Sequence, residues 1–64
     1  MPWSPDRYPP AMMHLAPEVR NKAIEIANAL LAEGYPEGRA IAIAIAQAKQ
    51  WATRHRGDPS SGPA

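Results

Sequence analysis

The stretch Glu33-Gly34-Tyr35-Pro36-Glu37 separates two long runs in which apolar residues recur at helical spacing. Glycine is favoured just after a helix ends, and proline is favoured at the first position of the next helix. Gly34 is therefore expected to end a first helix and Pro36 to begin a second, with Tyr35 folded back over the first helix's end. The stretch predicts a corner between two antiparallel helices, and thus an α-helical hairpin.

The first helix is predicted to run from about residue 17 to residue 33. Pro17 suits the first helical position, and Glu18 lies near the positive end of the helix dipole, four residues before Lys22 in the order that favours an ion pair. Arg20 falls on the apolar side, where its stem can lie along the surface while its head extends to water. The apolar stripe comprises Val19, Ala23, Ile26, Ala27 and Leu30, with Ile24 and Leu31 beside it, whereas Asn21, Glu25, Asn28 and Ala32 fall opposite.

The second helix is predicted from about residue 36 to residue 55. The segment Ile41–Ala46 alternates isoleucine with alanine, which could indicate a strand. Alanine favours helices and disfavours strands, however, and the apolar pattern continues at helical spacing as far as Trp51, so a helix is expected. Ile43 leaves the main stripe and needs a second cover, from the N-terminal arm or from a second subunit. The stripe comprises Ile41, Ala44, Ile45, Ala48, Trp51 and Ala52.

Alanines dominate the faces that the two helices turn toward each other. Ala23 and Ala27 lie in the stripe of the first helix, and Ala44, Ala48 and Ala52 lie in that of the second. Such small side chains allow two helix axes to approach at the short end of their usual spacing of about 8–10 Å. The sequence therefore predicts a tight seam, in which a larger side chain at position 48 is overpacked.

An N-terminal arm, residues 1–17, carries five of the eight prolines. Because proline restricts itself and the residue before it, the arm is expected to be extended, with one short helical turn at residues 9–14. It carries more apolar mass than a disordered tail usually holds. We expect it to pack across the open face of the hairpin; an exposed arm that binds a partner is the alternative. Its apolar side chains include Trp3, Tyr8, Met12, Met13 and Leu15.

Size and composition limit the classes of protein to which this chain can belong. With 64 residues it holds one domain, predicted at residues 1–56, followed by a flexible tail at residues 57–64. It has no Cys, its start lacks the basic and apolar regions of a signal peptide, and no apolar run reaches the about 18 residues of a membrane span. We expect a cytoplasmic protein. A net charge of +1 gives no electrostatic argument for nucleic acid or an anionic membrane.

Residues that carry chemistry do not form a recognisable site. His14 and His55 are far apart in sequence and lack further metal ligands, and Thr53 and His55 point away from each other on a helix. Gly34 and Gly38 do not form a phosphate-binding loop after a strand. Gly38 is instead expected to allow close approach of the helices at the corner. We therefore predict no catalytic, cofactor-binding or metal-binding residues and no enzymatic activity.

Three segments of the sequence form a distinctive combination. They are the start Met1-Pro2-Trp3, the segment Arg20–Leu31, and the segment Glu33–Ile41, which reads EGYPEGRAI. Together they resemble a family of small uncharacterised bacterial proteins, the YdaT-like group, over residues 1–55. The resemblance implies a helical fold in the bacterial cytoplasm and no assigned reaction. Some members of that group carry a further small domain after a linker, which would follow Gly57.

The sequence favours a helical module that acts by binding a protein partner or itself, because a chain this small cannot bury all the apolar surface that it carries. A homodimer is the simplest form of this prediction. The alternatives are a DNA-associated, helix-turn-helix-like protein, since two helices joined by a short turn invite that comparison, and an accessory domain of a larger protein. The predicted interaction surface comprises Trp3, Tyr8, Met12, Met13 and Ile43.

Overall fold

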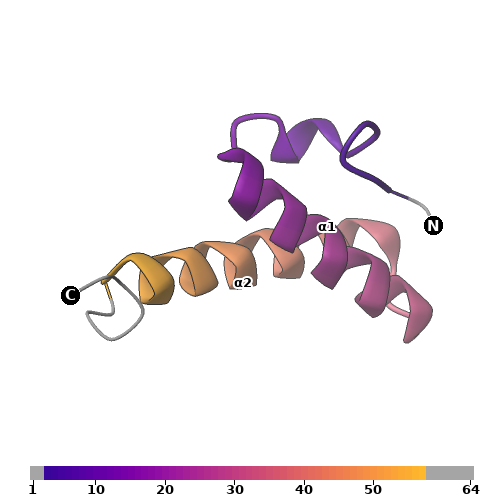
Figure 1. The fold of residues 1–64 in the computed structure, drawn as a ribbon. Helices are drawn as coiled ribbons and strands as arrows, with labels where there is room; N and C mark the ends of the chain where they lie inside the picture. The colour runs from indigo at the N-terminus through magenta and orange to yellow at the C-terminus, as the bar shows by residue number, and fades with distance from the viewer. Residues whose placement is uncertain (1–2, 58–64) are drawn as a thin grey trace.

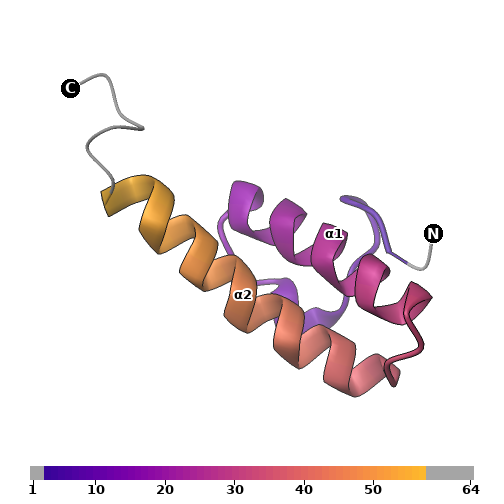
Figure 2. The same cartoon turned by 90° about the horizontal axis from the view of Figure 1, so that it is seen from below.

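The computed structural model describes residues 3–57, with side chains as far as residue 54. Within this range the chain forms a 3-10 turn, η1 (Pro10–Met12), and two helices, α1 (Pro17–Ala32) and α2 (Glu37–Gly57), without a strand. The helices run antiparallel, and the arm that carries η1 crosses one side of the pair (Figures 1 and 2). The predicted all-α hairpin with a packed arm is confirmed. Residues 58–64, where most of the flexible tail was predicted, lie outside the described residues.

The corner between α1 and α2 is closed by two backbone hydrogen bonds. Gly34 has a φ of 102°, a conformation that glycine adopts without steric cost. The Gly34 N–H donates to the Leu31 carbonyl at 3.0 Å, and the Tyr35 N–H donates to the Leu30 carbonyl at 3.1 Å. This pair of bonds is the Schellman motif, which satisfies the last carbonyls of a helix. Gly34 therefore ends α1, as the sequence predicts.

Both ends of α2 differ slightly from the prediction. The Ala40 N–H donates to the Pro36 carbonyl at 2.9 Å, so Pro36 caps α2 from outside and Glu37 is its first residue. At the other end α2 continues through Gly57, which was predicted to open the tail. A Cβ atom built on Gly38 meets nothing within 4 Å. The prediction that Gly38 allows a close approach of the helices is therefore wrong, because no neighbouring element comes near its backbone.

Alanines form the contact between α1 and α2. On α2, Ala40, Ala44 and Ala48 are fully buried at four-residue intervals, which places them on one helical stripe. Ala23 and Ala27 of α1 are also fully buried. The predicted alanine seam is therefore present. Larger side chains pack at its edges and remain half-buried: Ile26, Ile41, Ile45 and Trp51.

The buried face of α1 is rotated relative to the prediction. Ile24, which was expected beside the main stripe, is buried, whereas Ile26 from the stripe is only half-buried. Asn28 was expected on the polar side but is 9% exposed. The cause is the arm, whose Trp3 carbonyl accepts a hydrogen bond from the Asn28 amide. A helical period read from the sequence treats α1 as facing one partner, but α1 faces both α2 and the arm.

The arm contributes to the core at its centre and near both ends. Met12, in η1, is fully buried and is the largest side chain in that state among the described residues. Trp3, Tyr8 and Leu15 are half-buried and pack against the same cluster. A tight turn at Ser4–Arg7 lies between Trp3 and Tyr8 and is closed by backbone hydrogen bonds of 2.7 and 3.0 Å between Ser4 and Arg7. The arm thus forms the third layer of the fold, as the sequence predicts.

Candidate interaction surfaces

The five residues predicted to form an interaction surface have different environments. Met12 is fully buried in the core, so its assignment to an accessible surface is wrong. Trp3 and Tyr8 are half-buried because they pack against the core. Met13 is 57% exposed, and Ile43 is half-buried outside the core cluster. Packing of the arm therefore buries much of the apolar surface that motivated the prediction, and Met13 is the exposed large hydrophobic residue in the described part of the arm.

Arg20 of α1 contacts two parts of the arm. Its guanidinium carbon lies over the Tyr8 ring, 4.6 Å from the centroid, and its Nη1 donates to the Leu15 carbonyl at 3.4 Å. Its Nε is buried without a hydrogen-bond partner. The head of Arg20 is thus held over the arm, whereas the sequence predicted that it would extend to water. A cation over an aromatic ring is attracted by the ring's negative face, so this contact stabilises the packed arm.

Asn28 makes a second connection between α1 and the arm. Its Nδ2 donates to the Trp3 carbonyl at 3.1 Å, across 25 residues of sequence. Its Oδ1 is buried and has no hydrogen-bond partner. A buried polar atom without a partner carries a desolvation cost that the fold offsets elsewhere. Asn28 is therefore placed to hold the start of the arm, and its carbonyl remains an unused acceptor.

An open groove, here called the arm groove, runs between the start of the arm and α1. Its volume is ≈ 610 Å³. Apolar side chains from both sides form its walls, with Trp3 and Pro5 on the arm and Ile24 and Ala29 on α1. The remaining residues that line it are Ser4, Asn21, Glu25 and Asn28.

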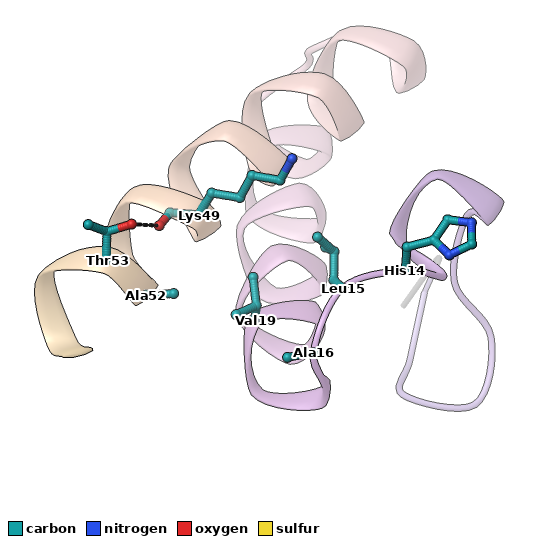
Figure 3. A pocket seen from close by; sticks show the side chains of 7 residues that line it. All are labelled: His14, Leu15, Ala16, Val19, Lys49, Ala52 and Thr53. Atoms are coloured by element: carbon teal, nitrogen blue, oxygen red, sulfur yellow. Dashed lines mark hydrogen bonds between the residues drawn. The ribbon is translucent and has the colours of Figure 1, made fainter. Parts of the chain in front are cut away.

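A second open groove, here called the end groove, lies where the arm enters α1 and α2 passes beside it. Its volume is ≈ 620 Å³. Leu15, Val19 and Ala52 supply its apolar side chains, and the Lys49 side chain extends from α2 toward α1 (Figure 3). The other residues that line it are His14, Ala16 and Thr53. It lies at the open end of the hairpin, opposite the corner.

The end groove carries positive charge along its α2 side. Lys49 and Thr53 also line an adjoining hollow of ≈ 360 Å³, and Arg54 lines that hollow with them. A further hollow of ≈ 390 Å³ is lined by Lys22 and Arg54, among others. Lys22 itself is engaged by Glu25 at 3.0 Å and lies over the Trp51 ring at 5.6 Å. It does not form the predicted pair with Glu18. Among the α2 side chains that the structure describes, Lys49 lines the end groove and Arg54 lines the hollow beside it.

His14 and Thr53 both line the end groove, but they lie on opposite sides of it (Figure 3). The Thr53 hydroxyl donates to the Lys49 carbonyl at 3.0 Å, and the His14 ring is directed away from α2 (Figure 3). A nucleophile and a general base must be within hydrogen-bond reach of each other, so this arrangement is not a catalytic pair. Within the described part of the chain, no three His, Asp or Glu side chains gather in a way that could hold a metal ion.

The corner presents an exposed aromatic side chain between acidic residues. Tyr35 is 37% exposed, and Glu33 and Glu37, two residues away on either side, are exposed as well. Tyr35 and Met13 are the exposed large hydrophobic residues among those described. The sequence predicts a purely structural corner, so its exposed tyrosine is a feature that the structure adds.

A curated relative bears directly on the sequence resemblance. The chain is 46% identical to a protein named uncharacterized protein YdaT from Bacillus subtilis (strain 168), over 79 aligned positions that cover 97% of this chain. The resemblance to the YdaT-like group is confirmed. The chain spans 53% of the length of that relative. No family model and no solved structure matches it.

The sequence does not indicate that Arg20 and Asn28 hold the arm or that Lys49 lines a groove. Arg20 and Asn28 were assigned to surfaces because helical periodicity says nothing about an arm that returns over the helix. From the sequence, Lys49 is expected only to interact favourably with the negative end of α2's dipole.

Of the helices in residues 3–57, neither is both long and apolar enough to span a bilayer.

Proposed function

We propose that this YdaT-like chain is a non-enzymatic interaction module that binds a second copy of itself or another protein. The observation that carries the proposal is the accessible apolar surface that remains after the arm has packed. Met13 is 57% exposed and Tyr35 is 37% exposed, and two open grooves with apolar walls lie on the same small molecule. Apolar side chains beside grooves are typical of surfaces that bind another protein.

The arm groove supports the same proposal for a partner of different sequence. Its apolar walls are formed by Trp3, Pro5, Ile24 and Ala29, and the buried Asn28 Oδ1 is an acceptor without a partner. A partner segment that inserts an apolar side chain here gains the free energy of removing that side chain from water. Trp3, alone among the five residues predicted from the sequence, lines this groove.

Two measurements on the whole chain test the proposal. Sedimentation equilibrium up to high micromolar concentration reports self-association, and the amide spectrum of the ¹⁵N-labelled chain in bacterial extract reports binding to other molecules. We expect a rise in average mass, or amide shifts confined to residues around the two grooves, Met13 and the corner. A Met13→Ser/Tyr35→Ser variant should reduce the effect, whereas Ala46→Ser, at an exposed alanine of α2, should not. A chain that stays monomeric and keeps an unchanged spectrum in extract contradicts the proposal.

The lack of enzymatic activity and the cytoplasmic location belong to the same proposal. The engaged Thr53 hydroxyl and the outward His14 ring support a binding role for the end groove over a catalytic one. A sequence without Cys is compatible with a reducing compartment. Fractionation of cells that express the chain, followed by immunodetection, tests the location.

Duplex DNA is the second candidate partner, supported by Lys22, Lys49 and Arg54 around the hollows on α2. The net charge of +1 and the pairing of Lys22 with Glu25 weaken it, because non-specific DNA binding depends on phosphate neutralisation. We expect no gel shift with duplex DNA at low salt. A shift that disappears as salt rises would favour the DNA-associated alternative.

A role as an accessory domain is compatible with both candidates. The chain spans 53% of YdaT, so the hairpin in such a relative is accompanied by further sequence. We propose that the hairpin supplies the binding surface in that context. Comparing the binding of this chain with that of full-length YdaT tests whether the surface works in the longer protein.

A further inference from the structure

We infer that two copies of this chain associate by placing the corner of one copy, Tyr35 with Glu33 and Glu37, in the end groove of the other. The inference rests on the proposed self-association and names the surfaces that meet. Three observations carry it: the positions of the exposed apolar side chains, the charges around them, and the shape of the groove.

One exposed apolar side chain lies at the corner, and the other belongs to the residue that precedes the end groove's first lining residue in the chain. Tyr35 is 37% exposed at the corner, and Met13 is 57% exposed in the residue before His14, which lines the end groove. Among the described residues, Tyr35 and Met13 are the exposed large hydrophobics. A contact between the corner of one copy and the end-groove side of the other would shield both side chains from water. A methionine thioether and an aromatic ring attract each other beyond the burial of their area.

Charges at the two ends have opposite sign. Glu33 and Glu37 flank Tyr35, and with the nearby Arg39 the corner carries two carboxylates against one guanidinium, a net charge of −1. Lys49 lines the end groove, and Arg54 lines the hollow that adjoins it. Opposite charges around an apolar contact steer association and set the orientation of the partners.

The groove is shaped to admit a protruding side chain. It is open, its volume of ≈ 620 Å³ lies in the range of about 300–1,000 Å³ typical of binding pockets, and Leu15, Val19 and Ala52 give it an apolar floor. Lys49 extends beside that floor, where a carboxylate next to an inserted tyrosine can reach it (Figure 3). Each copy has one corner and one groove. Two copies can therefore close into a two-fold dimer with two such contacts, or continue as a chain of copies.

Sedimentation equilibrium of charge-exchange variants tests the pairing. Tyr35→Ala should raise the dissociation constant by about tenfold or more, as expected for a central aromatic anchor. Lys49→Glu and Glu33→Lys should each raise it by about two- to fivefold, the range of exposed ion pairs. A chain carrying both Lys49→Glu and Glu33→Lys should return to within about twofold of the original value, because the charges are exchanged across the same contact.

Mixing and folding controls make the test independent of stability. Tyr35→Ala keeps an intact groove and Lys49→Glu keeps an intact corner, so a mixture of the two should associate more strongly than Tyr35→Ala alone. Gln47→Ala, at an exposed position on α2 outside the end groove, should behave like the original chain. Circular dichroism melting checks that each variant is folded.

The outcomes separate this inference from the proposed function. If the original chain is monomeric at high micromolar concentration, the inference is overturned, and the spectrum in extract still decides whether the module binds another protein. If the chain associates but Tyr35→Ala and Lys49→Glu match the original, the corner and end groove are not the interface, whereas self-association itself stands. Loss in the single variants with recovery in the exchange variant supports the pairing.

Discussion

Gly34 and Gly38 lie four residues apart but occupy different backbone environments. Gly34 has a φ of 102°, a backbone conformation that residues other than glycine rarely adopt. Gly38 lies in the first turn of α2, where a Cβ would meet nothing within 4 Å. The first glycine is therefore required by the Schellman motif, whereas the second weakens a helix without a packing reason.

A pair of alanine substitutions should show this difference. Gly34→Ala should lower the free energy of unfolding by about 1–3 kcal/mol, because it places a side chain at a strained backbone conformation. Gly38→Ala should raise it by about 0.5–1 kcal/mol, because alanine loses less conformational entropy in a helix than glycine does. Urea denaturation measures both, and a destabilised Gly38→Ala would show that a contact at this position has been overlooked.

The adjacent residues Met12 and Met13 offer a second matched pair. Met12 is 0% exposed and Met13 is 57% exposed. Truncating a fully buried methionine removes its transfer free energy and leaves a cavity, so Met12→Ala should lower the free energy of unfolding by about 2–5 kcal/mol. Met13→Ala should change it by less than about 0.5 kcal/mol when measured at low protein concentration. Equal effects at the two positions would mean that the arm is not packed as described.

The seam between α1 and α2 depends on small side chains. On α2 the buried alanines 40, 44 and 48 alternate with exposed ones at positions 42 and 46. The same residue type therefore serves two purposes within one helix: it allows close packing on one side and supports helix formation on the other.

Enlarging one alanine on each side of α2 tests the seam. Ala48→Leu should lower the free energy of unfolding by about 1–3 kcal/mol, because the added methylenes force the helices apart. Ala46→Leu should change it by less than about 0.5 kcal/mol, since that position is exposed and leucine is a good helix former. Thermal melts followed by circular dichroism provide the comparison. Equal melting temperatures for Ala48→Leu and the original chain would rule out the seam.

The arm is the element that completes the fold. It is joined to α1 through the Asn28–Trp3 hydrogen bond and the Arg20–Tyr8 ring contact, and it adds Met12 to the core. Two helices with a seam of alanines bury little apolar area on their own, and chains of this size are stable only with additional support. The arm supplies that support through side chains, because the chain has no Cys for a disulfide.

Removing the arm should therefore affect the whole molecule. A chain that begins at Pro17 should lose its cooperative thermal transition and most of its helical circular dichroism signal, since it lacks the third layer of the core. Asn28→Ala should give a graded result, lowering the free energy of unfolding by about 1–3 kcal/mol through loss of the bond to the arm. Full cooperativity without the arm would contradict a three-layer core.

Much of the architecture follows from local chemistry. Gly34 and Pro36 predict the corner because their backbone preferences are intrinsic, and the alanine-rich run is recognisable as a helix because of its propensity. Which apolar residues form an exposed surface is harder to predict from the sequence. Met12 and Met13 are chemically the same, and whether one is buried depends on the path of η1 over the hairpin.

The two helices, the glycine-ended corner, the alanine seam and the resemblance to the YdaT-like group follow from the sequence alone, since each depends on residues close together in the chain or on similarity along it. The tertiary structure decided how far α1 is rotated, that Asn28 and Arg20 hold the arm, that Gly38 has no close neighbour, and that Tyr35 and the end groove lie at opposite ends. The rotation of α1 and the contacts of Asn28 and Arg20 arise where the arm returns over the helices, and the helical period contains no information about a segment that approaches from outside the helix.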